Sequence, residues 1–462
     1  MDGRWQWWHA RMMEAELFHD PGLGNGSYLL RTEPGNALLV DPDRRVDRYL
    51  RKAEELGLEI TAVLDTHLHA DFVSGSLEVA SRTGAASFVP EEADVGFPHR
   101  GVKPGERLEL GDAEVEVVAT PGHAPEHVSY VARFVEGPPL LFSGGAIIAG
   151  GAARSDLVSS DMTERLTREE FHTLHESFAE LPDETPLYPT HGGGSFCSAG
   201  GGKRHVSSLG EERSTNPLLS LLEDEFVSWW PTTFPRIPAY FARMRAVNRA
   251  GPALRATIVD PKPLAPKEFA EAAREDGAFV VDCRHPDAYA LAHLEGSLAV
   301  PFRDSFPTWL GWLAPEDAHL LLVVDDLPLD RIVDACLLVG YERFDGVLKG
   351  GVAAWIEAGL EVRSLPTIGP QDAVPWLEMG AQPLDVREPD EYELEHIANA
   401  TPVPLGSLAG SAGELPTGRP LVAYCASGFR SVSAASILEG LGIGPVVNLR
   451  GGYGAWRTAY RD

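Results

Sequence analysis

Cysteine is scarce in this chain, with four residues among 462, and none has the C-x-x-C spacing of a metal or redox pair. Positive charge is scarce too, because 68 Asp and Glu residues stand against 39 Lys and Arg residues and leave a net charge of −29. No apolar run approaches the roughly 20 residues of a membrane span. These shortages predict that the chain binds neither nucleic acid nor a membrane and carries no disulfide framework.

The first twelve residues, MDGRWQWWHARM, lack the apolar stretch of a signal peptide. Together with reduced cysteines, this predicts a cytoplasmic protein. Hydrophobic residues make up 44% and charged residues 23%, which is typical of a globular protein. At roughly 150 residues per domain, the length suggests about three domains. The sequence leaves open whether the chain forms a homo-oligomer.

Short apolar runs and amphipathic stretches alternate through the first half of the chain. Strands are predicted at 28–30, 37–40, 60–66, 115–118, 128–132 and 140–142, with helices at 46–56 and 168–180. This pattern predicts a layered α/β domain over residues 1–258. The proline-rich segment 261–266 predicts a linker after it.

The second half of the chain contains an internal repeat. Val280-Val-Asp-Cys-Arg284 recurs 103 positions later as Pro383-Leu-Asp-Val-Arg387, and the Gly-Gly and Trp of 348–355 recur in 449–456. Each copy alternates apolar strands with helices, which is typical of a parallel sheet covered on both faces. Two α/β domains are therefore predicted, over residues 263–365 and 366–462.

In the second copy, Cys425 follows the apolar run Leu421–Tyr424 and precedes a helix predicted to begin near Ser431. Backbone N–H groups converge at such a position and favour the nucleophilic thiolate. Gly428 lets the loop curl round the sulfur, and Arg430 adds positive charge. The alternative is that Cys425 is a small buried core residue.

The spacing C-x-x-G-x-R-S, between an Asp-Val-Arg strand and a Gly-Gly-Tyr-Gly-Ala-Trp segment, resembles the rhodanese family over residues 366–462. This resemblance implies that Cys425 is catalytic and carries sulfane sulfur as a persulfide. It also implies that Ser427, Gly428 and Arg430 bind the anionic sulfur donor or acceptor.

The first copy departs from the rhodanese pattern. Asp325 stands roughly where the cysteine should be, and Asp330 replaces the arginine. A carboxylate cannot carry sulfane sulfur, so this copy is predicted to be inactive. Cys283 and Cys336 are expected in its core.

Eleven of the fifteen histidines precede residue 206. His67 and His69 follow a predicted strand, His123 lies in a Thr-Pro-Gly-His turn, and His191 follows Tyr-Pro-Thr. Neutral imidazole binds zinc, iron and copper. Any one of these histidines could be a surface residue, but four at strand ends of one domain predict a metal site.

These histidine motifs resemble the metallo-β-lactamase superfamily, and most of all its persulfide dioxygenases that are fused to rhodanese domains. The resemblance implies a metallo-β-lactamase αββα sandwich followed by two rhodanese-like α/β domains with parallel sheets. It also implies one Fe(II) held by two histidines, which map onto His67 and His123, and by an aspartate. Phe72 stands where binuclear members have a further histidine, so a single metal is expected.

The aspartate position of that family is Gly145 in this chain. We expect His69 to complete the site, which gives His67, His69 and His123 as metal ligands. The alternatives are that Asp71 turns inward, that zinc replaces iron, or that the domain is metal-poor. Gly145 could also be glycine because its backbone needs a positive φ.

The pattern as a whole predicts an enzyme of sulfide detoxification with two activities. Its first domain would oxidise a low-molecular-weight persulfide to sulfite, and Cys425 would exchange sulfane sulfur between persulfide, sulfite and thiosulfate. The alternatives are a sulfurtransferase with an inert first domain and a zinc hydrolase of the glyoxalase II type.

Overall fold

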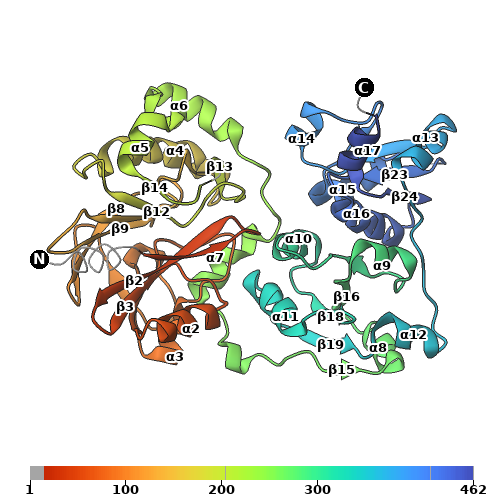
Figure 1. Cartoon of the computed structure of the whole chain (residues 1–462), viewed down its shortest axis with the longest axis horizontal. Helices are drawn as coiled ribbons and strands as arrows, with labels where there is room; N and C mark the ends of the chain where they lie inside the picture. Colours follow the sequence, from red (N-terminus) through yellow and green to blue (C-terminus); the bar gives the residue numbers. More distant parts are fainter. Residues whose placement is uncertain (1–14, 203, 417, 461–462) are drawn as a thin grey trace, which may run out of the picture. The chain divides into compact units, whose positions relative to one another are not determined.

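The computed structural model describes residues 15–202, 204–416 and 418–460. The first twelve residues, which are predicted to lack a signal peptide, therefore lie outside the described residues. The chain divides into two compact units (Figure 1): one holds the residues up to Thr257 together with Asp334–Gly340, and the other holds Ile258–Val333 and Tyr341 onward. Within the described ranges, no helix has the length and apolar character needed to cross a membrane.

Two six-stranded sheets form the first unit. In spatial order, one contains β1 (Glu16–Asp20), β2 (Asn25–Glu33), β3 (Asn36–Val40), β4 (Glu59–Leu64), β5 (Ala86–Pro90) and β6 (Arg100–Val102). The other contains β14 (Ser207–Ser208), β12 (Pro186–Pro189), β10 (Leu140–Gly144), β9 (Val128–Arg133), β8 (Ala113–Ala119) and β7 (Arg107–Leu110). A separate pair joins β11 (Gly151–Ala153) to β13 (Ser198–Gly200).

Helices cover the outer faces of these two sheets (Figure 1). They are α2 (Asp47–Glu55), α3 (Ser76–Thr83), α4 (Thr163–His172), α5 (Leu209–Thr215), α6 (Glu223–Trp229) and α7 (Phe241–Ala250). Strand residues such as Tyr28, Leu64, Val115 and Tyr130 fill the core between the sheets. This arrangement confirms the predicted αββα sandwich.

One predicted helix of this unit is displaced. The helix expected over 168–180 begins five residues earlier, as α4, and ends at His172 in a π-helical turn over Thr173–Ser177. In this turn, the Thr173 hydroxyl donates a hydrogen bond (2.7 Å) to the carbonyl of Pro121, which lies between β8 and β9. Such a tertiary contact is not visible in the apolar periodicity of the sequence.

The second unit contains two five-stranded parallel sheets of the same topology. The first is ordered β15 (Pro263–Leu264), β19 (Phe344–Leu348), β18 (His319–Val323), β16 (Ala278–Asp282), β17 (Leu298–Ala299). The second is ordered β20 (Thr367–Ile368), β24 (Val446–Leu449), β23 (Leu421–Tyr424), β21 (Gln382–Asp385), β22 (Thr401–Pro402). Strand β15 lies inside the segment predicted to be a linker.

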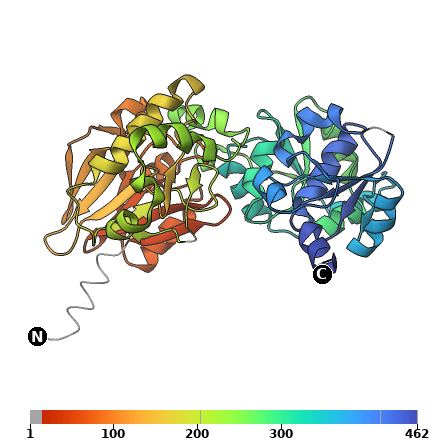
Figure 2. The ribbon, with the colours of Figure 1, turned by 90° about the horizontal axis from the view of Figure 1, so that it is seen from above.

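Each of these two copies also contains helices, although residues Asp334–Gly340 of the first copy group with the first unit. The first copy has α8 (Pro266–Ala272), α9 (Pro286–Leu291), α10 (Phe306–Leu313), α11 (Leu329–Leu338) and α12 (Gly351–Glu357). The second has α13 (Pro370–Glu378), α14 (Pro389–Leu394), α15 (Leu408–Ser411), α16 (Phe429–Gly440) and α17 (Gly452–Tyr460). Figure 2 shows the colours of these helices running from green to blue along the chain.

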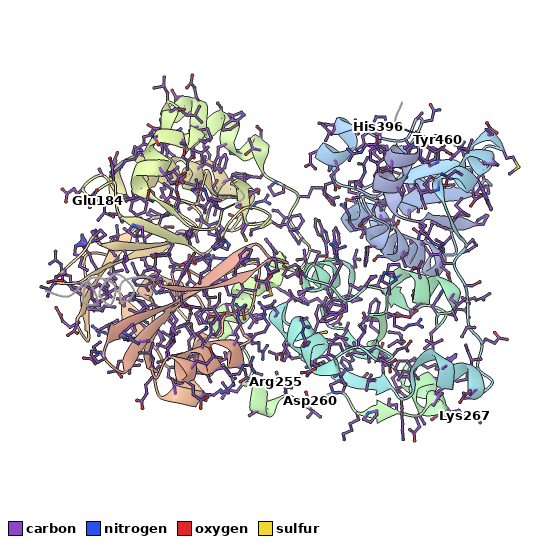
Figure 3. The ribbon with its side chains drawn as sticks, in the orientation of Figure 1. Glu184, Arg255, Asp260, Lys267, His396 and Tyr460 are labelled. Atoms are coloured by element: carbon purple, nitrogen blue, oxygen red, sulfur yellow. The ribbon has the colours of Figure 1, made fainter. Side chains whose placement is uncertain are left out.

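The repeat extends to individual side chains. His293 stacks on Tyr289, and His396 stacks on Tyr392, with the same 3.9 Å between ring centroids. His396 lies at the surface of the second copy (Figure 3). These shared contacts confirm that the two copies have one fold.

Candidate metal centre and thiol loop

Three histidines from separate loops of the first unit meet in its interior. His67 follows β4, His123 lies between β8 and β9, and His191 follows β12. One ring nitrogen from each lies within 4.8 Å of the other two, and all three residues are buried. The parallel pairing of β10 with β12 brings the third histidine to the same edge as the other two.

The outer nitrogen of each of these rings has its own hydrogen-bond partner. His67 Nδ1 contacts Thr66 Oγ1 (2.8 Å), which itself donates to Asp41, so the imidazole must be the donor. His123 Nδ1 donates to the Arg154 carbonyl (2.6 Å). His191 Nδ1 lies 3.1 Å from Asn25 Oδ1. These contacts leave the three Nε2 atoms unprotonated, as metal ligation requires.

The electrostatics of the cluster keep its rings neutral. Burial lowers the pKa of His67, His123 and His191 well below the usual imidazole value. The Nε2 atoms of His67 and His191 then face one another at 3.3 Å with lone pairs on both sides. A cation between them removes this repulsion, so the residues present fit one divalent transition metal.

His69 lies beside this cluster, with its ring centroid 4.3 Å from that of His67. Its Nε2 is 3.3 Å from Asp41 Oδ1, and this carboxylate outweighs burial and raises the pKa of His69. Its ring stacks on Phe72, with 4.2 Å between the ring centroids. The structure groups His67 and His123 with His191, and it places His69 in two further groups, one with Asp71 and His191 and one with Asp41 and Asp65. The role predicted for His69 stays a prediction.

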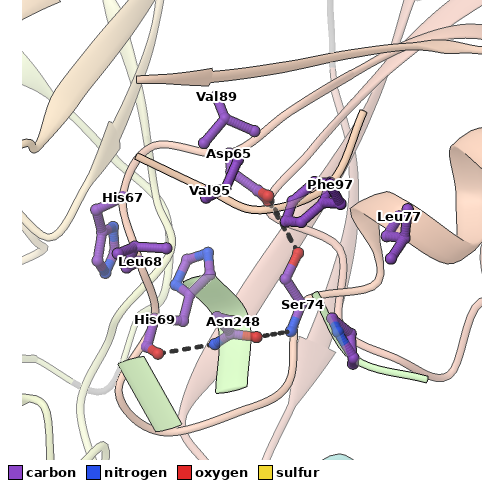
Figure 4. Close-up of a pocket in the computed structure, with 11 residues that line it drawn as sticks. Asp65, His67, Leu68, His69, Ser74, Leu77, Val89, Val95, Phe97 and Asn248 are labelled. Atoms are coloured by element: carbon purple, nitrogen blue, oxygen red, sulfur yellow. Dashed lines mark hydrogen bonds between the residues drawn. The ribbon is translucent and has the colours of Figure 1, made fainter. Parts of the chain in front are cut away.

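The backbone around His69 is fixed by Asn248 of α7. Its amide donates to the His69 carbonyl (2.8 Å) and accepts from the Ser74 N–H (2.9 Å), as Figure 4 shows. The cavity beside them measures about 10 Å³, which is room for about one water molecule. The hydrogen bonds of Asn248 therefore hold the loop in place. The cavity itself has no room for a substrate.

Gly145 lies against the metal cluster, and its backbone conformation does not require glycine. The positive φ belongs to its neighbour Gly144 (58°), so the alternative that Gly145 needs a positive φ is wrong. A Cβ at position 145 would lie 2.9 Å from His123 Cδ2 and 2.8 Å from Ala153 Cβ. Ala153 therefore occupies part of the space that a carboxylate side chain at position 145 would need.

Asp71, the alternative ligand, forms a second group with His69 and His191, in which one ligand atom from each residue lies within 4.8 Å of the other two. Its Oδ2 accepts a hydrogen bond from Asn25 (2.6 Å) and lies 3.6 Å from His191 Nδ1, so it orients that ring from behind. Burial raises the pKa of this carboxyl group. The hydrogen bond from Asn25 could not be predicted from local sequence, because Asn25 lies 46 positions from Asp71 in the chain.

The second candidate site is the loop between β23 and α16. Cys425 follows β23 directly and is buried, and the Gly428 N–H donates to its Sγ (3.1 Å). Gly428 has φ 94°, and a Cβ there would lie 3.1 Å from the Gly451 nitrogen. The loop thus needs glycine at this position to aim an N–H at the sulfur.

Arg430 lines the same cavity as Cys425, but it is not an unpaired cation. Its two terminal nitrogens donate to the two oxygens of Glu391 at 2.6 and 2.7 Å. This bidentate pair neutralises much of the positive charge that the sequence suggested. Glu391 lies 39 residues away on α14, so the spacing of the loop could not reveal it.

The first copy has no thiol in the corresponding loop. Asp282 pairs with Val323 and Asp385 pairs with Tyr424, so the residue that corresponds to Cys425 is Val324. The prediction that Asp325 occupies this position is wrong by one residue. Asp325 Oδ1 instead accepts from the Val352 N–H at the start of α12 (3.2 Å). Cys283 and Cys336 are both fully buried, as predicted.

Comparisons with known proteins agree with this architecture. Residues 21–195 match the metallo-beta-lactamase superfamily, and residues 265–358 and 371–459 each match the rhodanese-like domain. The mitochondrial persulfide dioxygenase ETHE1 of Bos taurus is 30% identical over 203 residues, which is 44% of this chain and 74% of that protein. A hydroxyacylglutathione hydrolase of Methylobacterium sp. (strain 4-46) is 31% identical over 200 residues, 38% of this chain and 74% of that protein.

A solved structure extends the likeness beyond the first domain. The crystal structure of a metallo-beta-lactamase from Staphylococcus aureus subsp. aureus COL superposes with a TM-score of 0.65 at 29% identity, covering 73% of this chain and 99% of that one. The chain therefore belongs to the metallo-beta-lactamase superfamily and continues into two rhodanese-like domains.

Proposed function

We propose that this chain is a sulfur-metabolism enzyme that oxidises a low-molecular-weight persulfide in its first domain and transfers sulfane sulfur through Cys425. One observation carries the proposal: a buried cluster suited to one transition metal, in the part that resembles a persulfide dioxygenase, shares a chain with a cradled thiol in a rhodanese-like domain. The domains proposed are residues 1–258, 263–365 and 366–462.

In the first domain, His67, His123 and His191 would hold the metal through their Nε2 atoms, with Asp41, Arg154 and Asn25 contacts fixing the rings. We propose Fe(II), with zinc as the alternative. When bound, iron would supply sites for the persulfide sulfur and O₂. The chain's own contribution is a buried, neutral ligand set, which favours the divalent ion without adding negative charge.

In the last domain, Cys425 would attack sulfane sulfur while the Gly428 N–H stabilises the charge on its Sγ. Sulfite would accept that sulfur and leave as thiosulfate. The first rhodanese-like copy would carry no sulfur, because Val324 stands in the thiol position. The four cysteines are free thiols, which fits the reducing cytoplasm that we propose as the location.

A zinc hydrolase is the second candidate function, because the hydroxyacylglutathione hydrolase is as similar to the first domain as the persulfide dioxygenase is. Metal analysis of the full chain after anaerobic purification separates the two. We expect about one iron per chain in the native protein and in His99→Ala, an exposed control, and a large loss of iron in His123→Ala and His191→Ala. Zinc in place of iron, with thioester hydrolysis, would support the hydrolase. A native chain without metal would leave sulfur transfer through Cys425 as the only proposed activity.

A further inference from the structure

The thiol of Cys425 opens into a cavity of about 260 Å³ that both rhodanese-like copies line. The second copy contributes the Cys425 loop and the start of α16. The first copy contributes one contiguous segment, from which Val300, Pro301, Arg303, Ser305 and Trp309 reach the cavity. The copy that lacks a thiol therefore supplies a wall of the site in which the other copy's thiol lies.

The two copies are held together next to this cavity. Helix α9 of the first copy lies against α16 (Figure 1), and Tyr289, Ala299, Val432 and Ala435 share one apolar cluster. The Ala299 N–H donates to Ser436 Oγ (3.1 Å). Because Ala299 ends β17 four residues before Arg303, this interface fixes the position of the segment that lines the cavity.

The charges in the cavity single out Arg303. Arg430 is held by Glu391 in a bidentate pair, so its charge is largely balanced. Arg303 is exposed and lies over the Phe429 ring, with its guanidinium carbon 4.8 Å from the ring centroid. Among the residues that the structure describes, Arg303 makes no ion pair. It is therefore a lining arginine whose positive charge is not already matched by a carboxylate.

The proposed reaction brings much negative charge to this place. The Cys425 thiolate attacks the terminal sulfur of thiosulfate, the S–S bond to the sulfonate breaks, and its electron pair leaves with sulfite. A persulfide forms on Cys425, and three negative charges are present before and after the step. A dianion next to a thiolate needs an unmatched cation at the sulfonate end.

We propose that Arg303, from the inactive copy, is the residue that binds the sulfonate oxygens of thiosulfate and sulfite at Cys425. The inactive copy is then a substrate-binding part of the sulfurtransferase and not a spacer. The inference rests on the proposed role of Cys425. It assigns to Arg303 the anion recognition that the sequence alone gave to Arg430.

The test compares native full-length chain with Arg303→Gln, Arg303→Lys and Arg331→Gln. Arg331 is a matched control, because it is an exposed arginine of the same copy over a phenylalanine ring (Phe302, 5.8 Å) and does not line the cavity. We expect Arg303→Gln to raise the thiosulfate KM about tenfold with little change in kcat, as expected for loss of one charge-assisted contact. Arg303→Lys should restore part of the affinity, and Arg331→Gln should match the native chain.

Salt gives a second readout that a merely structural role would not change. The thiosulfate KM of the native chain should rise with ionic strength more steeply than that of Arg303→Gln, because screening weakens only a charge that is present. An Arg303→Gln variant with native KM and native salt dependence would overturn the inference while leaving sulfur transfer by Cys425 intact.

Binding without turnover separates the inference from the proposed function. Thiosulfate binding to Cys425→Ser can be followed through the tryptophan fluorescence of the chain, since Trp309 lines the cavity. If the native chain transfers no sulfur but thiosulfate binds and Arg303→Gln removes that binding, the proposed function fails and the anion site stands. If Cys425→Ser does not bind thiosulfate, or binds it equally well with Gln at 303, the inference is overturned.

Discussion

Substitution of Gly428 by alanine tests whether the thiol loop depends on one backbone conformation. Gly428 has φ 94° and approaches the Gly451 nitrogen so closely that a Cβ would lie 3.1 Å from it. A left-handed conformation costs an L-residue about 1–2 kcal/mol. The hydrogen bond from this residue to Cys425 Sγ contributes about 1 kcal/mol more if the loop moves to relieve the strain.

Gly428→Ala should therefore lose about 2 kcal/mol of folding free energy, or move its N–H away from the sulfur, or both. A loss of about 2 kcal/mol changes the ratio of folded to unfolded chain roughly 30-fold. Urea unfolding measures the first effect, and thiosulfate sulfurtransferase activity measures the second. We expect activity to fall even under conditions in which the variant stays folded.

Gly440→Ala is the matched control, because Gly440 ends the same helix and a Cβ there meets nothing within 4 Å. Alanine should be neutral or stabilise this helix by up to about 1 kcal/mol. A Gly428→Ala variant with native stability and native activity would refute the idea that the loop needs this conformation to hold the thiol.

Three further predictions concern other parts of the chain. Cys425→Ser should abolish thiosulfate sulfurtransferase activity, whereas Cys197→Ser and Cys283→Ser keep it, and mass spectrometry should find added sulfur on Cys425 and on neither Cys283 nor Cys336. The Asp side chain of Gly145→Asp should clash with Ala153, so this variant should retain metal poorly. Adding Ala153→Gly should raise the iron content above that of the single variant. Equal iron content in both variants would contradict the packing argument. Arg45 and Arg48 outweigh burial and lower the pKa of Asp43 from 3.8 to about 2, so Asp43→Asn should cost about 2 kcal/mol at neutral pH. Because a lowered carboxyl pKa stabilises only above the unfolded value, this cost should shrink as pH falls from about 4 to 2, and a cost independent of pH would rule out the ion pairs as its source.

Most of the fold follows from local sequence patterns. The buried strands β2, β3, β4, β8, β9 and β10 coincide with predicted apolar runs, because each run is short and ends at turn residues. The duplicated Asp-x-Arg motifs form the same ion pair in both copies, with 2.6 Å from Arg284 to Asp282 and from Arg387 to Asp385. Motifs of this kind are local, so sequence alone can reveal them.

The parts of the site that the sequence did not show depend on distant partners. The four histidine motifs were recognised, but spacing could not tell that a ring nitrogen of His191 lies within 4.8 Å of one in His67 and one in His123. That proximity depends on the pairing of β12 with β10. The Glu391 partner of Arg430 and the contribution of Arg303 to the cavity likewise come from other strands and helices.

Oxygen consumption with a glutathione persulfide, measured together with the sulfur products, tests the central proposal most directly. We expect native chain and Cys425→Ser to consume O₂ at similar rates, because the histidine cluster is intact in both. The native chain should release mainly thiosulfate, and Cys425→Ser should release mainly sulfite. No persulfide-dependent O₂ uptake by the iron-loaded native chain, or the same products from both proteins, would contradict the account.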